Sequence, residues 1–403
     1  DTKGKVLDTR VCNGLMRSHA RLTYEGVAKA MKWTVSTDAT PLNDELYRVV
    51  AATDRIASIL RKKRMKRGAL DLQVPEPEIV LDDAEKAPID VKRRAQDPGI
   101  KRAYSAVEEL MLLANEEVAR FLMAKISPAI FRVHAAPDET KLERVVTLCD
   151  ALGIEFDPSD ASDPQRLGLF LDGIADHPLA QIIGHFTLRS LKQAAYDVTN
   201  IGHYGLALDA YLHFTSPIRR YPDLVVHRIV KEVLLEQRPA KQQVDDQLTL
   251  VAQLCSQRER KVMDIEREVS DLYRTVLMRK HIGEEFVGQV VEVASASVIV
   301  AIDSPYVDVR VPFSLLGSED YEASEDGLRA VAPRSGETVG LGDEIKIRIE
   351  EANINRRSTI ARRLVEAKKN KTPSKKSTHP RKDGGAKHKG GKPSKKRGES
   401  RKR

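Results

Sequence analysis

Two arginines stand between two prolines in the stretch HFTSPIRRYPDLVVHR, residues 213–228. Pro217 suits the start of a tight turn, and Pro222 both stops a helix from running through the stretch and suits the start of the next one. We therefore expect Arg219 and Arg220 on a rigid turn that leads into a helix. A guanidinium that is held in place loses little entropy on gripping a phosphate or a carboxylate. The pattern favours such a grip over a structural ion pair.

Aromatic and histidine side chains surround this turn. Tyr211, Phe214 and Tyr221 are candidates for stacking on nucleic-acid bases. His213 and His227 have no partner at metal-ligand spacing, so we predict that both are hydrogen-bonded structural residues.

Outward from the turn, residues 1–281 show the apolar period of helices. The clearest helix is predicted at 103–125, and the others at 13–36, 43–66, 138–152, 163–173, 178–194, 223–237 and 243–281. The Pro-interrupted stretch at 69–81 is typical of an edge strand or hairpin. Glu108 lies on a half-apolar face of the clearest helix together with Asn115, and a carboxylate there needs a partner. A binding role and an ordinary surface ion pair both remain open for it.

The apolar pattern changes to a period of two near residue 283. A β-branched run at 298–302 and alternating valines and isoleucines at 307–311 and 345–349 belong to five predicted short strands. A small barrel of the OB type is the obvious arrangement, and such barrels commonly bind oligonucleotides across their strand face. Phe286 and Phe313 can stack on bases there or can fill the barrel core. The predicted fold class is thus α+β, with a helix-rich part at 1–281 and an all-β barrel at 283–364.

The net charge of +8 belongs to the C-terminal tail. Residues 368–403 hold 16 lysines and arginines against two acidic residues, so the rest of the chain carries a net charge of −6. A segment so poor in apolar side chains cannot bury enough surface to order itself, and we predict that 365–403 is disordered. Its cations favour salt-sensitive contact with nucleic acid, with a purely solubilising tail as the alternative.

Cysteine use and hydropathy narrow the class of protein further. Cys12, Cys149 and Cys255 lie outside any CxxC arrangement, which argues against disulfides or zinc and favours a reducing cytoplasm. No apolar run is long enough to span a bilayer, so no membrane contact is expected. The first residue is Asp1, from which we expect that the sequence starts inside a longer protein.

Seven segments in order resemble the RNase II/RNase R (RNB) family of bacterial 3′→5′ exoribonucleases. They are SHARLTYEGV at 18–27, GALDLQVPE at 68–76, AVEELMLLAN at 106–115, FRVHAAPDETKL at 131–142, LRSLKQAAYD at 188–197, NIGHYGLALDAYLHF at 200–214 and the Arg-containing stretch at 213–228. The predicted barrel resembles the S-one-type RNA-binding domain that follows the RNB domain in this family. The Lys-rich tail is more similar to the ribonuclease R branch.

The resemblance implies roles for individual residues. Arg219 matches an arginine that holds the phosphate near the scissile bond, and Tyr24 matches a tyrosine that packs on the terminal nucleotide. Glu108 matches a glutamate that contacts the 3′-terminal ribose, and Glu266 matches one near the end of the RNA channel. We expect further RNA contacts from Arg220, Tyr221, Phe286 and Phe313.

Two departures from the family pattern affect the expected chemistry. Leu72 stands where many relatives carry a phenylalanine that clamps the last bases, and an aliphatic side chain cannot stack in that way. The family's Mg²⁺-holding aspartate cluster precedes the SHARLTY segment and is not found in residues 1–403, since Asp82 and Asp83 follow that segment and suit a loop. We therefore expect Mg²⁺ in the intact enzyme, no metal ligand in this chain, and no hydrolysis by this chain unaided.

The leading hypothesis is a ribonuclease R-like 3′→5′ exoribonuclease that hydrolyses single-stranded RNA processively to nucleoside 5′-monophosphates. Its partners would be single-stranded RNA and, beyond that, ribosomes or other RNA-decay factors. The alternative is a non-catalytic RNA-binding protein that uses the RNB scaffold and the barrel for grip alone. A third hypothesis is a translation-associated factor defined by the barrel and the tail. It is disfavoured because it does not explain the seven RNB-like segments.

Overall fold

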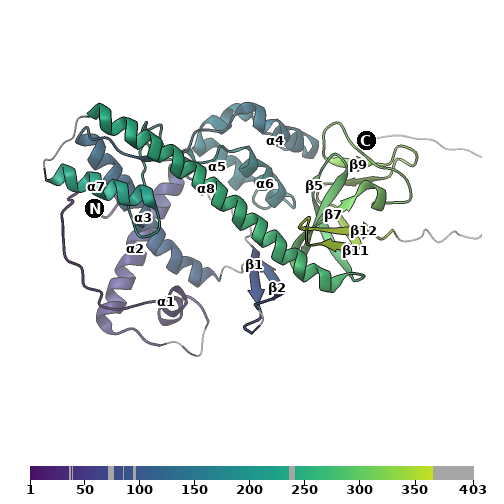
Figure 1. Ribbon diagram of the computed structural model, residues 1–403, viewed down its shortest axis with the longest axis horizontal. Helices are drawn as coiled ribbons and strands as arrows, with labels where there is room; N and C mark the ends of the chain where they lie inside the picture. The colour runs from purple at the N-terminus through teal and green to yellow at the C-terminus, as the bar shows by residue number, and fades with distance from the viewer. Residues whose placement is uncertain are drawn as a thin grey trace, which may run out of the picture. The chain divides into compact units, whose positions relative to one another are not determined.

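The computed structural model describes residues 1–35, 38, 40–70, 77–84, 86–93, 97–235 and 241–365. Helices precede the barrel strands along the chain (Figure 1). The helices are α1 (Tyr24–Ala30), α2 (Asp44–Lys66), α3 (Pro98–Ala124), α4 (Glu139–Leu152), α5 (Pro164–Gly173), α6 (Ala180–Ser190), α7 (Tyr221–Leu234) and α8 (Lys241–Met278). The strands are β1 (Pro77–Leu81), β2 (Pro88–Arg93), β3 (Phe131–Val133), β4 (Ala195–Asp197), β5 (Glu285–Val293), β6 (Ser297–Asp303), β7 (Tyr306–Pro312), β8 (Glu322–Ala323), β9 (Arg329–Val331), β10 (Thr338–Gly340), β11 (Glu344–Asn353) and β12 (Ser358–Arg363).

These elements confirm the predicted fold class. Residues Asp1–Val365 form one compact unit, so the division into domains at 281–283 stays a prediction. The tail predicted to be disordered lies outside the described residues from 366 onward. No described helix combines the length and the apolar character needed to cross a bilayer.

The predicted helix at 13–36 is wrong for most of its length. Helix α1 covers only Tyr24–Ala30, and the Thr23 side chain caps it by accepting a hydrogen bond from the Gly26 amide. The physical reason is burial, because short helices are stabilised mainly by packing an apolar face. Ala28 is fully buried and α1 packs against α3, whereas residues 12–23 are all exposed.

Helices α2 and α3 are joined by a buried ion pair. Arg64 donates to Glu109 through Nε at 3.1 Å and through Nη2 at 2.7 Å, and both side chains are almost fully buried. Removal of Arg64 would take away the ion-pair partner of the buried Glu109 carboxylate, which is strongly unfavourable. The pair therefore fixes α3, which carries much of the candidate site, against its neighbour.

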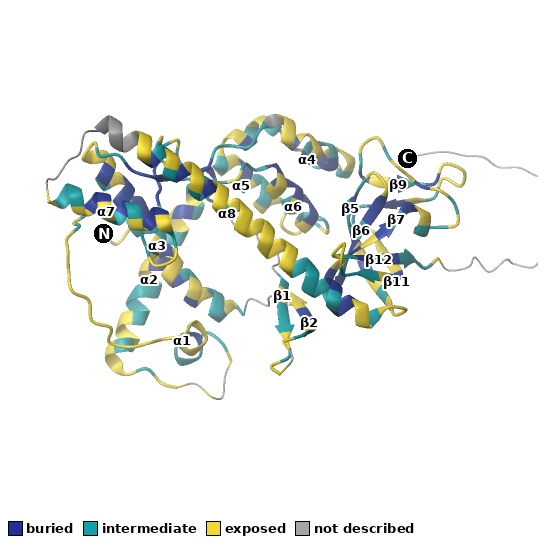
Figure 2. Cartoon of the chain, viewed as in Figure 1, coloured by how far each residue is buried: buried dark blue, intermediate teal, exposed yellow. Residues whose placement is uncertain are grey.

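Five strands close into the barrel that the sequence predicts, and their order is β11-β12-β7-β6-β5. All neighbouring strands are antiparallel except β12 and β7, which are parallel at Ile360 and Arg310. The alternating side chains of β7 divide as expected, with Val307 and Val309 buried and Arg310 exposed (Figure 2). Leu277 and Met278, at the end of α8, complete the barrel core. The three-stranded sheet β10-β9-β8 was not predicted, because its strands are only two or three residues long.

The helical part has its own core beside the short antiparallel pair β3 and β4. Leu122, Ile130, Leu212 and Val226 are all fully buried there. The amide of Arg132 in β3 donates to the carbonyl of Tyr211 at 2.9 Å. This bond ties the chain just before the Arg-containing turn to the sheet.

We predict that Gly68→Ala destabilises the chain by roughly 3 kcal/mol, through a left-handed backbone and a steric overlap. Gly68 has a φ of +98°, and a Cβ there would lie 2.3 Å from the Cα of Gln165. Gly153 is the matched control, because its φ is +67° and a Cβ would meet nothing within 4 Å. Gly153→Ala should cost only about 1 kcal/mol. Urea unfolding of both variants measures the difference, and equal losses would show that α5 moves aside without cost.

Candidate functional site

The turn that precedes α7 presents Arg219 on the surface. The carbonyl of Ser216 accepts hydrogen bonds from the amides of Arg219 at 3.3 Å and Arg220 at 3.1 Å. Helix α7 then begins at Tyr221 with Pro222 in its first turn, which confirms the predicted turn between prolines. The Arg219 side chain is exposed.

A buried carboxylate holds this turn from inside. Asp223 has no exposed surface, and its Oδ1 accepts from the amide of Ser216 at 2.7 Å and from Nη2 of Arg220 at 2.8 Å. Arg220 is therefore committed to a structural ion pair, and Arg219 is the arginine that can grip an anion. The geometry favours a positioning role for Arg220 over the RNA contact that we expected. Asp223 itself was not predicted, since nothing in the sequence separates it from an ordinary acidic residue in the first turn of a helix.

Asn115 of α3 clamps the same segment from the other side. Its Oδ1 accepts from the amides of Phe214 at 2.9 Å and Thr215 at 3.2 Å, and its Nδ2 donates to the hydroxyl of Tyr211 at 3.0 Å. Only 2% of Asn115 is exposed. Side chains of α3 and α7 thus satisfy the amides of three consecutive residues, 214–216. The sequence indicated Asn115 only as an amide side chain on a half-apolar helix face. Its hydrogen-bond partners could not be predicted from that pattern.

The aromatic residues around the turn have different surroundings. Tyr211 is buried, and Phe214 stacks on His227 with ring centroids 3.9 Å apart and an angle of 5° between the planes. The prediction that Tyr211 stacks on bases is therefore wrong, because its ring is buried. Phe214 is partly buried and His227 covers one face of its ring, so base stacking by Phe214 stays a prediction. Tyr221 is 55% exposed and still has an accessible ring. His227 is a structural residue as predicted, since its Nε2 lies 2.9 Å from the Phe214 carbonyl oxygen.

One side of α3 connects the turn to two further predicted site residues. Tyr24 stacks on Tyr104 with centroids 3.7 Å apart, and Glu108 follows Tyr104 by one helical turn. Asn115, which holds the Arg219 turn, lies two turns beyond Glu108, so Tyr104 and Asn115 are separated by roughly 16 Å along the helix. The Glu108 carboxylate is half exposed and lies 3.8 Å from Nη2 of Arg64, a weak contact that leaves it accessible. The structure thus arranges Tyr24, Glu108 and the turn along a single helix.

The remaining predicted site residues lie on α8 and the barrel. Glu266 is exposed on α8, and Phe286 is half-buried in β5 with an edge contact to His281. Phe313 is 8% exposed and belongs to the barrel core. The stacking role predicted for Phe313 is therefore corrected in favour of the core alternative. Leu72 lies outside the described residues.

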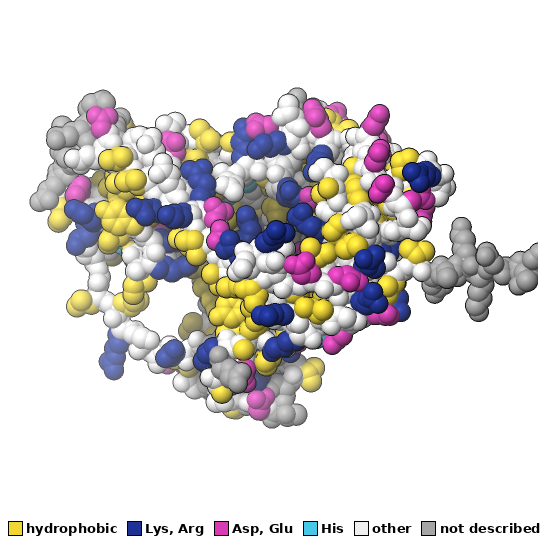
Figure 3. All heavy atoms as spheres, turned by 45° about the vertical axis from the view of Figure 1, so that its right-hand side comes forward, with side chains coloured by type: hydrophobic (Ala, Val, Ile, Leu, Met, Phe, Trp, Pro, Cys, Tyr) yellow, Lys and Arg dark blue, Asp and Glu magenta, His cyan; other side chains and the backbone are white. Residues whose placement is uncertain are grey.

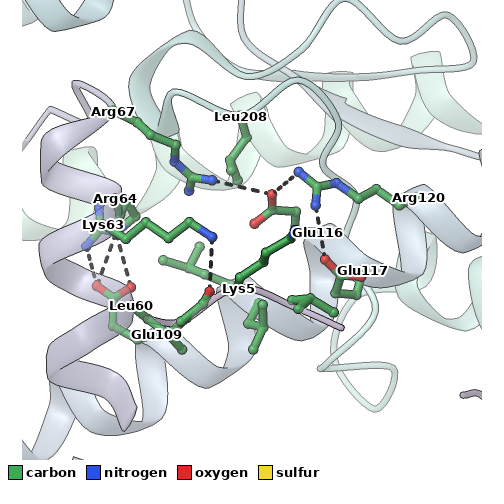
Figure 4. Close-up of a pocket in the computed structure, with 14 residues that line it drawn as sticks. Lys5, Leu60, Lys63, Arg64, Arg67, Glu109, Glu116, Glu117, Arg120 and Leu208 are labelled. Carbon is green, nitrogen blue, oxygen red and sulfur yellow. Dashed lines mark hydrogen bonds and ion pairs between the residues drawn. The ribbon is translucent and has the colours of Figure 1, made fainter. Parts of the chain in front are cut away.

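A charged pocket lies on a different side of α3 (Figure 4). Glu116 accepts there from Arg120 at 2.6 Å and from Arg67 at 3.5 Å, and Lys63 donates to the carbonyl of Gly4. These cations already have partners within the protein. The pocket is best explained as a structural ion-pair network that joins α2 to α3.

The described residues do not fit the expected Mg²⁺ ion. Within the ranges that the structure describes, no three His, Cys, Asp or Glu side chains gather where they could hold a metal. Asp82 and Asp83 lie in the hairpin between β1 and β2, where Asp82 accepts from the amide of Ala84. These two carboxylates therefore belong to a loop, as the sequence predicts.

Two histidines behind the turn are held in the neutral form. Burial lowers the pKa of His203 to about 3, and burial together with the positive charge of Arg220 lowers that of His213 to about 2. The Nδ1 of His213 lies 2.9 Å from the Tyr196 hydroxyl, which confirms the predicted structural role. Neither side chain accepts a proton readily in the folded state. Acid should therefore destabilise the packing behind the turn.

We predict that the free energy of unfolding falls as the pH drops below about 6.5. The folded pKa values of His203 and His213 lie below the unfolded value, so the unfolded chain binds protons that the folded chain does not. Each histidine should cost roughly 2 kcal/mol by pH 5. Urea unfolding at pH 7.5 and pH 5 measures the loss. His213→Gln should reduce the loss by roughly 2 kcal/mol, and the rest should remain because burial also lowers the pKa of His134 and His185. The exposed control His19→Gln should leave the loss unchanged, and equal effects of the two variants would contradict the assignment.

Comparisons with known proteins identify the family of the chain. The RNB domain model matches residues 1–236. Ribonuclease R of Escherichia coli is 30% identical over 368 residues, which are 88% of this chain and 44% of that protein, and ribonuclease R of Thermotoga maritima is 34% identical over 360 residues, which are 88% of this chain and 49% of that protein. The chain therefore spans less than half the length of these relatives.

A solved structure shares the fold over most of the chain. Mycoplasma genitalium RNase R in complex with ribose-methylated single-stranded RNA matches with a TM-score of 0.76 and 25% identity. The match covers 85% of this chain and 53% of that one. With the domain match over more than half of the sequence, these similarities establish that the chain belongs to the RNB domain family.

Proposed function

We propose that this chain forms the RNA-gripping part of a ribonuclease R-like 3′→5′ exoribonuclease. The observation that carries the proposal is the exposed Arg219 on a rigid turn. That turn is held by the buried side chains of Asp223 on α7 and Asn115 on α3. Helix α3 also carries Glu108 and the Tyr104 ring on which Tyr24 stacks. The substrate would be single-stranded RNA, shortened processively to nucleoside 5′-monophosphates. Activity is proposed for the whole protein, since this chain covers only 44% of the E. coli relative.

Each residue would act on a different part of the terminal nucleotide. The guanidinium of Arg219 can donate two parallel hydrogen bonds to one phosphate, and its fixed turn keeps the entropy loss small. The Tyr24 ring can stack on any base, which suits an enzyme that does not select sequence. The accessible carboxylate of Glu108 can accept a hydrogen bond from a ribose hydroxyl, a group that DNA lacks at the 2′ position.

The relatives support RNA as the partner. The E. coli and T. maritima proteins are named ribonuclease R, and the M. genitalium protein was solved in complex with single-stranded RNA. On the face shown in Figure 3, Lys and Arg side chains are interspersed with Asp and Glu, so the folded part has no uniformly basic surface there. We infer that local, rigid contacts dominate the grip and that the basic tail adds a salt-sensitive attraction.

Several finer features belong to the same proposal. Mg²⁺ would be the cofactor of the intact enzyme, and the cytoplasm its location, consistent with three free cysteines. Ribosomes or other RNA-decay factors would be further partners. The second candidate function is RNA binding without catalysis, which accounts equally well for the Arg219 turn and is separated from the first by the activity of the longer protein.

For the 403-residue chain alone we predict binding of single-stranded RNA without Mg²⁺-dependent release of nucleotides. Binding is measured by the fluorescence anisotropy of a labelled oligonucleotide at several salt concentrations, and release by chromatography with Mg²⁺ or with a chelator. Affinity should fall as salt rises. Release of monophosphates by a pure preparation would show that the chain holds its own metal site. Absence of RNA binding at low salt would refute the proposed function.

In a protein that contains this chain and degrades RNA, Arg219→Ala should lower the single-turnover rate roughly 100-fold or more and weaken binding less than about tenfold. The reason is that Arg219 acts on one phosphate whereas many contacts hold the strand. Arg228→Ala is the matched control, because Arg228 is also exposed but lies on α7 outside the turn. The assigned role of Arg219 fails if both variants reduce the rate equally, or if the Arg219→Ala rate is unchanged. A longer protein that carries the metal ligands and binds RNA but never degrades it would favour the non-catalytic candidate.

A further inference from the structure

Tyr104 is an exposed aromatic residue in the middle of the candidate site, and the contacts proposed for Arg219, Tyr24 and Glu108 leave it without a role. Its ring lies 3.7 Å from that of Tyr24, and the two planes differ by 21°. Tyr104 is 45% exposed and Tyr24 is 37% exposed. The two rings therefore form a stacked pair that stays open to solvent, although aromatic rings usually gain stability by burial.

The two tyrosines come from elements of very different rigidity. Tyr24 is the first residue of α1, which has only seven residues and follows the exposed stretch at 12–23. So short a helix is not stable by itself. Tyr104 belongs to the 27-residue α3, which the buried pair of Arg64 and Glu109 fixes in place. The Tyr104 ring is thus attached to the more rigidly held of the two helices.

The chain just after α1 is also held against α3. A Cβ at Gly99 would lie 2.5 Å from the backbone carbonyl group of Trp33, so the backbones are in close contact there. The guanidinium of Arg102 lies over the Trp33 ring at 4.5 Å. With one end fixed by this contact, the Tyr24–Tyr104 stack decides the orientation of the other end, where the Tyr24 side chain begins.

We propose that Tyr104 is a positioning residue that holds the Tyr24 ring flat as a platform for the 3′-terminal base. This inference rests on the proposed function and deepens it. One face of the Tyr24 ring is covered by Tyr104, so the base uses the opposite face. Glu108, one helical turn after Tyr104, then lies on the ribose side of the same nucleotide. Because Tyr104 already restricts the motion of the Tyr24 ring, little further entropy is lost when a base stacks on it. Stacking of this kind suits any base.

The test is a double-mutant cycle in the 403-residue chain. The probe is single-stranded RNA with 2-aminopurine as its 3′-terminal base, whose fluorescence is quenched when it stacks. Tyr104→Leu should reduce the quenching and weaken binding about fivefold, and Tyr104→Phe should keep both, because the ring and not the hydroxyl supports Tyr24. In the Tyr24→Leu background, Tyr104→Leu should cause no further loss, since its effect passes through Tyr24.

Controls separate this role from general loss of structure. Tyr47→Leu removes a tyrosine that is 51% exposed on α2 and should change neither readout. Circular dichroism shows whether each variant keeps its helix content. Three results would each overturn the inference. They are additive losses of affinity in the cycle, unchanged quenching and affinity in Tyr104→Leu, and equal losses in Tyr104→Leu and Tyr104→Phe. If the unmodified chain fails to bind the probe, the proposed function itself fails, which is a distinguishable result.

Discussion

The candidate site depends on the hydrogen bonds that Asp223 and Asn115 make to consecutive backbone amides. These two side chains are almost fully buried and take the amides of Phe214, Thr215 and Ser216. A buried carboxylate or amide without partners is costly, so these hydrogen bonds stabilise both the side chains and the backbone segment that they hold. The backbone of the turn that carries the exposed Arg219 is therefore rigid, although Arg219 makes none of these bonds itself.

Helix α3 is the frame to which the other parts of the site are attached. Along it come the aromatic pair at Tyr104, the accessible carboxylate of Glu108 and the clamp at Asn115. An adjacent face of α3 is fixed by ion pairs, with Arg64 on Glu109 and with Arg67 and Arg120 on Glu116. The charged side chains named on that face are therefore paired within the protein.

The sequence predicts the fold better than it predicts the site. Apolar periodicity identified the long helices and the five barrel strands, because burial of one face fixes both. It failed at 13–36, where the apolar residues of 12–23 find no surface to pack against. The turn around Arg219 was predicted from its prolines, whose backbone limits act locally. Asp223 and Asn115 were not assigned their roles, because side-chain partners cannot be read from a local pattern, and those of Asn115 lie about 100 residues away.

The two arginines of the turn show why residue type alone could not settle the site. Arg219 and Arg220 are adjacent, equally charged and equally flanked by proline, and the sequence led us to expect an RNA contact from both. The turn geometry directs them differently, because a rigid turn gives successive side chains different directions. Arg220 neutralises the buried Asp223, and without it that carboxylate would lack its charge partner. Because Arg220 pairs with Asp223, the exposed Arg219 can bind an anion.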